Sequence, residues 1–203
     1  MNWDLFAAFL IITAILIVVP GPIVTLIIAT GARQGVRAAL VTVGGTSPGN
    51  AVLLAVIAVG LGWVLQNAET LFAVLRWVGA AYLIWLGITV WRHAGETKPA
   101  ETGGRINFTR GFLVALSNPK TIAFFTAFLP QFVDPSLPAA PQLFVMCTVT
   151  AVLAALSDSA WAIAAGMGRA WFMRPERTRL LGRMSGVVLI GGGVWLSLAR
   201  RTG

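Results

Sequence analysis

The chain has 203 residues, of which 57% are hydrophobic and 11% are charged, and its mean hydropathy is +0.82. This composition excludes a water-soluble globular domain, because a domain of this length cannot hide so many apolar side chains from water. The net charge of +8 would favour a nucleic-acid partner in a soluble protein. Here the basic residues lie in short gaps between apolar runs, so we expect them to contact membrane lipid and expect no nucleic acid.

Six apolar runs are long enough to suggest membrane spans, since a spanning helix needs about 20 mostly apolar residues. A polar segment with proline and glycine, 93–107, separates the third run from the fourth and is expected to be a cytoplasmic linker. The predicted fold is an all-α integral membrane protein with a single transmembrane domain, 1–203, and about six transmembrane helices. These helices are expected within 5–28, 36–65, 71–91, 112–133, 142–168 and 184–199.

The two halves of the chain resemble each other weakly. The motif Arg76-Trp77-Val78-Gly79 in the third run is similar to Arg183-Met184-Ser185-Gly186 in the sixth. Three helices in each half would insert the second copy upside down, which predicts inverted repeats over 1–92 and 108–203. Chance similarity between apolar segments is the alternative. The positive-inside rule predicts both termini outside (N-out/C-out), because most of the arginines then face the cytoplasm.

Three of the apolar runs contain proline. Pro20, Gly21 and Pro22 interrupt the first run, and Asn118, Pro119 and Lys120 interrupt the fourth. The second run has an interruption at 44–50 that includes Pro48 and Asn50. Proline removes a backbone N–H and clashes with the carbonyl four residues earlier, so Pro20 and Pro22 should free carbonyls near Leu16 and Val18. Freed backbone groups at membrane depth must face protein or a water-filled cavity, although a plain kink is the simpler alternative.

Lys120 and Asp158 are the two ionisable residues deep within apolar runs. Each is disfavoured at mid-membrane by about 2.5–3.5 kcal/mol on insertion scales, so such residues usually face the interior of a bundle. Counting residues from the run ends places both charges and the proline breaks in one layer, where a zwitterionic substrate could meet a carboxylate, an ammonium and broken-helix ends. Asp158 is the candidate for carrying a coupled proton. A structural ion pair and a snorkelling lysine are the alternatives.

Catalysis and metal binding find little support in the sequence. The chain has one cysteine, Cys147, and one histidine, His93, which lies in the predicted linker. An enzyme would need a nucleophile with its base, a cysteine pair or a metal cluster. We therefore expect no enzyme, no catalytic residue, no metal site and no cofactor.

Several motifs together resemble the LysE/RhtB family of bacterial amino-acid exporters over nearly the whole chain. They are VVPGP at 18–22, GARQG at 31–35, GAAYLIWLG at 79–87, RGFLVALSNPKTIAFF at 110–125 and LPQFV at 129–133. The resemblance implies a bacterial inner-membrane exporter that exchanges amino acids or their derivatives for protons and forms a homodimer. It also matches the two proline motifs to the family's breaks and Asp158 to a frequent fifth-helix acid.

One position departs from the family pattern. The family often has a polar residue after the first break, whereas this chain has Ile23. The resemblance therefore leaves the substrate open, and a transporter of a cation or of another small polar metabolite is the alternative.

Overall fold

The structure is a computed structural model that describes residues 1–67, 69–95 and 104–198. Across these residues the chain is helical and forms no strand, which confirms the expected all-α fold. The helices are α1 (Trp3–Val18), α2 (Pro22–Gln34), α3 (Val36–Asn67), α4 (Glu69–Arg92), α5 (Gly104–Leu116), α6 (Pro119–Phe128), the 3-10 helix η1 (Leu129–Phe132), α7 (Ala139–Met167), α8 (Arg169–Phe172) and α9 (Pro175–Leu198).

The expected number of membrane spans is confirmed. Five helical segments in the described part of the chain are long and apolar enough to cross a membrane. The pair α1 and α2, bent by 41° at a short break, passes the same test when taken together, which gives up to six spans. Another span, Asn107–Phe132, combines α5, α6 and η1, so it also contains a break.

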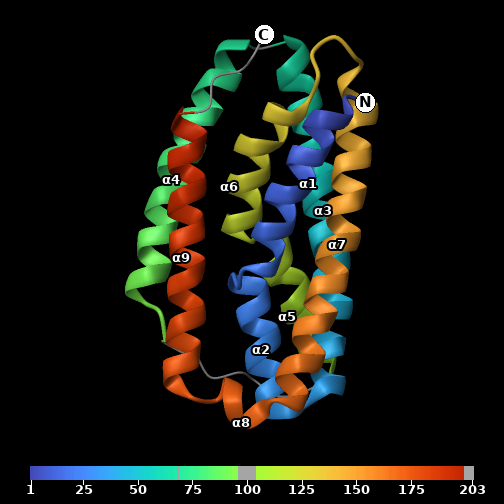
Figure 1. Ribbon diagram of the computed structural model, residues 1–203. Coiled ribbons are helices and arrows are strands. Elements are labelled where there is room, and N and C mark those ends of the chain that lie inside the picture. The colour runs from blue at the N-terminus through green and yellow to red at the C-terminus, as the bar shows by residue number, and fades with distance from the viewer. Residues whose placement is uncertain (68, 96–103, 199–203) are drawn as a thin grey trace.

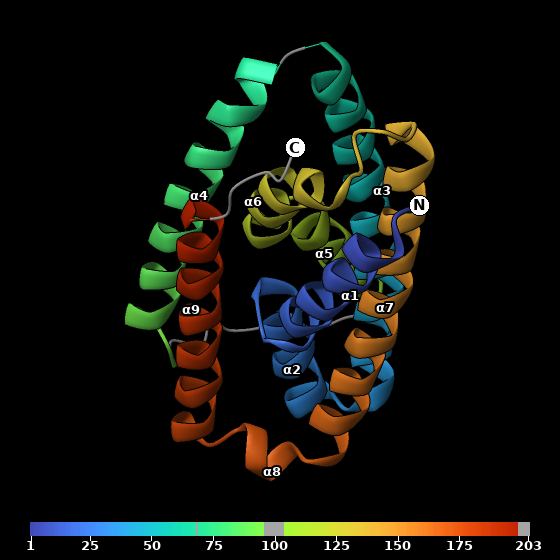
Figure 2. The ribbon, with the colours of Figure 1, turned by 45° about the horizontal axis from the view of Figure 1, so that its top comes forward.

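The two broken spans lie between two pairs of long helices. Helices α4 and α9 pair on one side of the bundle and α3 and α7 lie on the other, with α1, α2, α5 and α6 between them (Figures 1 and 2). Glycines allow α4 and α9 to cross closely, because a Cβ on either Gly87 or Gly186 would lie 2.7 Å from the other's carbonyl oxygen. These glycines therefore serve packing, as small residues often do between membrane helices.

Aromatic side chains fill much of the space between α6 and its neighbours. The ring of Phe128 stacks on Phe124 at 4.2 Å and on Trp195 of α9 at 5.1 Å, while Phe9 of α1 meets Phe132 edge-on at 5.7 Å. These residues except Trp195 belong to the largest buried apolar cluster. The cluster fixes α6 between α1 and α9.

The predicted interruption of the second run at 44–50 is wrong. Helix α3 continues through Pro48, whose side chain is exposed on the outer face of the helix. The glycines of this stretch have a packing role, because a Cβ on Gly45 would collide with the Phe108 carbonyl oxygen and one on Gly49 would lie 2.5 Å from that of Phe112. They allow the backbone of α5 to approach α3 closely.

Two further boundaries differ from the sequence prediction. Of the expected linker 93–107, residues 93–95 form a turn and 96–103 lie outside the described residues, but the last four are already part of α5. The sixth span begins at Pro175, not near residue 184. Hydropathy marks only the apolar part of α9, whereas its first turns carry arginines such as Arg183, which packs over the Trp91 ring at 5.7 Å.

Candidate functional site

The first span breaks where its two prolines lie. Helix α1 ends at Val18, and Pro22 occupies the first turn of α2, where a missing N–H costs no helical hydrogen bond. Gly21 precedes α2 without any side chain to cap its first N–H groups. The break therefore frees the carbonyls that end α1, as the sequence predicted, and also the N–H groups that begin α2.

Lys120 supplies the partner for the carbonyls of α1. Its Nζ donates to the carbonyl oxygens of Leu16 at 2.8 Å and Val19 at 2.7 Å. The side chain is only 7% exposed, so it does not snorkel to the surface. A cation at a helix C-terminus is favoured by the helix dipole and by charge-assisted hydrogen bonds. Gly21 leaves room for it, since a Cβ there would lie 2.8 Å from Lys120 Cδ.

The break of the fourth span positions Lys120. Asn118 caps α6 by accepting a hydrogen bond from the Lys120 backbone N–H at 3.1 Å, and its Nδ2 donates to Thr121 Oγ1 at 2.9 Å. Pro119 takes the first helical position, which suits proline. The Asn-Pro-Lys motif thus ends one helix, starts the next and aims an ammonium group at the first break.

Asp158 lies on α7 and faces α3. Its carboxylate is 7% exposed and accepts a hydrogen bond from Thr46 Oγ1 at 3.1 Å. Among the described residues, no ion pair joins Lys120 to Asp158, and each binds other partners. The predicted alternative of a purely structural pair between them is therefore wrong.

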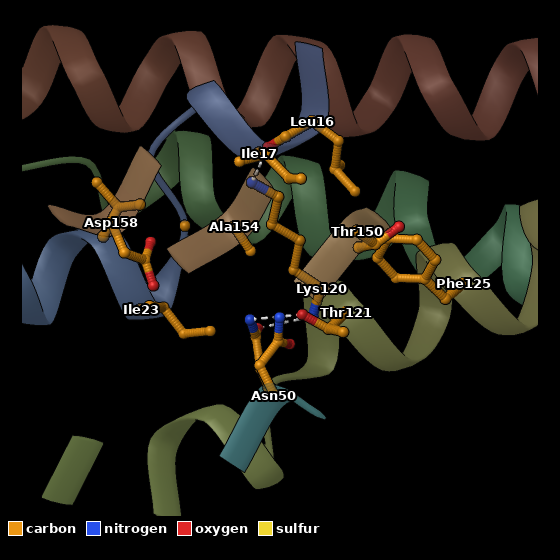
Figure 3. Close-up of a pocket in the computed structure, with 13 residues that line it drawn as sticks. Leu16, Ile17, Ile23, Asn50, Lys120, Thr121, Phe125, Thr150, Ala154 and Asp158 are labelled. Atoms are coloured by element: carbon orange, nitrogen blue, oxygen red, sulfur yellow. Dashed lines mark hydrogen bonds between the residues drawn. The ribbon is translucent and has the colours of Figure 1, made fainter. Parts of the chain in front are cut away.

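A small cavity joins the two breaks and the two charges. Its volume is about 50 Å³, enough for a few water molecules at the 10–15 Å³ or so that each requires. Figure 3 shows Lys120 reaching toward the end of α1, with Asp158 lying apart from it. The lining residues come from both broken spans, α3 and α7; the polar ones are Asn50, Asn118, Lys120, Thr121, Thr150 and Asp158.

Most of the predicted site residues meet here, but one does not. Gly21, Asn50, Asn118, Lys120 and Asp158 line the cavity. Pro20, Pro22 and Pro119 lie in the breaks and shape them without being among the residues that line it. Pro48 points outward from α3 and lies apart from the cavity.

Two hydrogen bonds that the sequence did not predict hold the site. Thr46, fully buried, is the hydrogen-bond donor to Asp158, and Trp161 Nε1 donates to the Val18 carbonyl at 3.3 Å. Thr46 and Asn50 are four residues apart in an apolar helix, which places both on one face. That spacing is the signal that could have identified Thr46.

A second cation binds the end of α2. Arg169 Nε donates to the Ala32 carbonyl at 2.8 Å, and its Nη2 donates to the Arg33 carbonyl at 2.5 Å. Both half-helices of the first span therefore end on a basic side chain. In the described residues no group of three or more His, Cys, Asp or Glu side chains gathers to hold a metal ion.

Comparisons with known proteins agree on one family. The profile described as LysE type translocator matches residues 14–200. A homoserine/homoserine lactone efflux protein of Salmonella typhimurium is 31% identical over 98% of this chain and 99% of its own length. An uncharacterized membrane protein of Pseudomonas aeruginosa is 32% identical over 96% of this chain and 95% of its own, and a leucine efflux protein of Enterobacter is 27% identical over 87% of both. No solved structure matches the chain.

Proposed function

The chain belongs to the LysE type translocator family, and on this premise we propose that it is a secondary-active exporter of amino acids or amino-acid derivatives across the bacterial inner membrane. Members of this family are translocators and not enzymes, and the chain is a multi-pass membrane protein. Relatives named for efflux of homoserine, homoserine lactone and leucine support this substrate class.

The observation that carries the proposal is the buried polar cavity at the meeting of two broken spans. Lys120 and Asp158 are both 7% exposed within it, and ionisable groups at membrane depth usually mark a transport pathway. Unwound backbone in a membrane is tolerated where it lines a cavity. A cavity that now has room for only a few waters must widen to admit an amino acid, as alternating access requires.

The basic end of the bundle supports a cytoplasmic entry side. The end of α2, the start of α3, the end of α4, and α8 with the first turns of α9 lie together, and they carry Arg33, Arg37, Arg92, Arg169, Arg174, Arg177 and Arg179 (Figure 1). The positive-inside rule places such an end in the cytoplasm, with Met1 outside.

Opposed helix directions support inverted repeats over 1–92 and 108–203. Each half has a broken helix, a long helix and a further span, and each runs opposite to its counterpart (Figure 1). Rocking of one repeat against the other would then open the cavity first to one side of the membrane and then to the other.

Asp158 couples transport to protons in this proposal by binding either a proton or the substrate ammonium. The Asp158→Asn variant keeps an acceptor for the Thr46 hydroxyl but cannot exchange a proton. In proteoliposomes of known orientation, we expect it to exchange labelled substrate at saturating concentration while losing the acceleration that a proton gradient gives the wild type. A variant still fully driven by the gradient would refute this role.

The exporter assignment itself is tested with the wild type. Inside-out vesicles or proteoliposomes are offered a panel of labelled amino acids and their lactones, with and without a proton gradient. Gradient-dependent uptake of one class is expected. If well-folded protein moves none of them, the cargo is another small polar metabolite or a cation.

A further inference from the structure

We propose that the cavity recognises the zwitterionic head group of an amino acid whose side chain is uncharged. The substrate ammonium binds Asn50 Oδ1 and the Asp158 carboxylate, and the substrate carboxylate binds the backbone N–H groups of Ile23 and Val24 at the start of α2. This inference rests on the proposed function and assigns each pole of the substrate to named atoms.

Asn50 provides an unused acceptor for the substrate ammonium. Asn50 is 8% exposed and lines the cavity, yet its Oδ1 has no hydrogen-bond partner. A buried acceptor without a partner is costly, so it indicates a ligand donor that is bound in function. Asn50 lies one helical turn from Thr46, which donates to Asp158 Oδ2 at 3.1 Å. An ammonium between α3 and α7 can therefore reach both the amide oxygen and the carboxylate, and Figure 3 shows Asn50 directed into this space.

The start of α2 provides free N–H donors for the substrate carboxylate. Pro22 has no N–H, and in the described structure the N–H groups of Ile23 and Val24 have no backbone or side-chain acceptor, whereas the Thr25 N–H binds the Gly21 carbonyl at 2.8 Å. Ile23 and Val24 both line the cavity. Free N–H groups at a helix N-terminus, aligned with the helix dipole, form a ready anion site.

Lys120 is less suited to the substrate carboxylate than its charge suggests. Two of its three N–H groups already bind the carbonyls of Leu16 and Val19. We therefore assign to Lys120 the role of holding the break open. The substrate carboxylate is assigned to the free N–H groups at the start of α2, which follows directly in the chain.

Charge balance selects an uncharged side chain. Among the described residues that line the cavity, Lys120 and Asp158 are the ionisable ones, and a zwitterion adds no net charge to this pair. The rest of the lining is largely apolar, with Leu16, Ile17 and Phe125 among its members. A further charge on the substrate side chain would be buried without a counter-charge, which is strongly unfavourable.

Counterflow in proteoliposomes tests the assignment. Labelled leucine or homoserine, whichever the wild type exchanges, is competed with the unlabelled amino acid, the 2-hydroxy acid that lacks the ammonium, the amine that lacks the carboxylate, and lysine. The wild type should bind each of the last three at least tenfold more weakly than the parent amino acid, since a hydrogen bond to a charged group is worth about that factor or more.

The variant Asn50→Leu removes the acceptor at similar volume. We expect it to weaken binding of the parent amino acid about tenfold and to leave binding of the 2-hydroxy acid unchanged. Discrimination between the two then shrinks by that factor. Asn50→Asp, which keeps an acceptor, should retain the discrimination even if the leucine variant folds poorly. The matched control is Val52→Ala, an exposed position on the same helix.

Two results would overturn the inference. In one, Asn50→Leu retains full discrimination against the 2-hydroxy acid; in the other, the wild type binds the 2-hydroxy acid or the amine as tightly as the amino acid. Either leaves the exporter assignment intact, because the wild type still exchanges amino acids. Failure of folded wild type to exchange any amino acid removes both proposals.

Discussion

Replacing Lys120 by methionine tests whether this residue holds the first break. Methionine keeps the linear side chain but leaves the carbonyls of Leu16 and Val19 without their donor. A buried acceptor left unpaired costs about 1–3 kcal/mol, so the two together cost about 2–6 kcal/mol. Methionine also avoids the cost of burying an ammonium, which offsets part of this loss. We expect a net destabilisation near the lower end, about 2 kcal/mol.

The assay is thermal unfolding of the purified protein in detergent, together with counterflow in proteoliposomes. For a chain of about 200 residues, 2 kcal/mol corresponds to a fall of about 4–8 °C in Tm. Exchange should fall further than stability explains, because the end of α1 loses its fixed position beside the cavity. The exposed neighbour Ile122, changed to alanine, is the control on the same helix.

A second substitution reaches the same contact from the other side. Gly21→Ala places a Cβ 2.8 Å from Lys120 Cδ, and the flexible stem must shift to make room. We expect a smaller loss of stability and of exchange than for Lys120→Met.

Wild-type Tm and wild-type exchange in Lys120→Met would refute the argument that the ammonium supports the break.

Two further predictions concern packing and the turn before α7. Gly45→Ala should lower stability by about 1–3 kcal/mol, because its Cβ would collide with the Phe108 carbonyl, whereas Gly44→Ala, whose nearest neighbour lies at 3.8 Å, should be neutral or slightly stabilising in a thermal melt. Equal melting of the two variants would contradict this. Hydrogen bonds from the Ser136 hydroxyl and backbone N–H hold the pKa of Asp134 below its ordinary range, so Ser136→Ala should raise that pKa in a carboxyl NMR titration. Because the pKa is lowered, these bonds stabilise the fold at neutral pH, and this contribution disappears as the pH falls through the lowered pKa. If the Asp134 titration is the same in Ser136→Ala as in the wild type, the Ser136 hydrogen bonds are not the cause of the lowered pKa.

The sequence predicted the features that depend on local chemistry. Pro20 and Pro22 interrupt the first span as expected, and the carbonyls of Leu16 and Val18 accept hydrogen bonds from side chains. The ionisable side chains of Lys120 and Asp158 had to face the interior because lipid disfavours them. Both lie in the cavity.

The sequence could not predict which groups meet across the bundle. Pro48 has the same local chemistry as the other prolines, yet α3 continues through it. The donor to the freed carbonyls comes from a residue about one hundred positions away, and only tertiary packing selects it. Likewise, nothing local to Asp158 indicates Thr46 as its partner.

Basic side chains from different elements bind the ends of the two half-helices of the first span. Lys120 ties α1 to α6, and Arg169 ties α2 to the junction of α7 and α8. The end of α1 is held by Lys120 of α6 and by Trp161 of α7, whereas the end of α2 is held by Arg169 at the start of α8. We expect a relative displacement of α6 and α8 to change the 41° bend of this span at the Pro-Gly-Pro break, which lies beside the cavity.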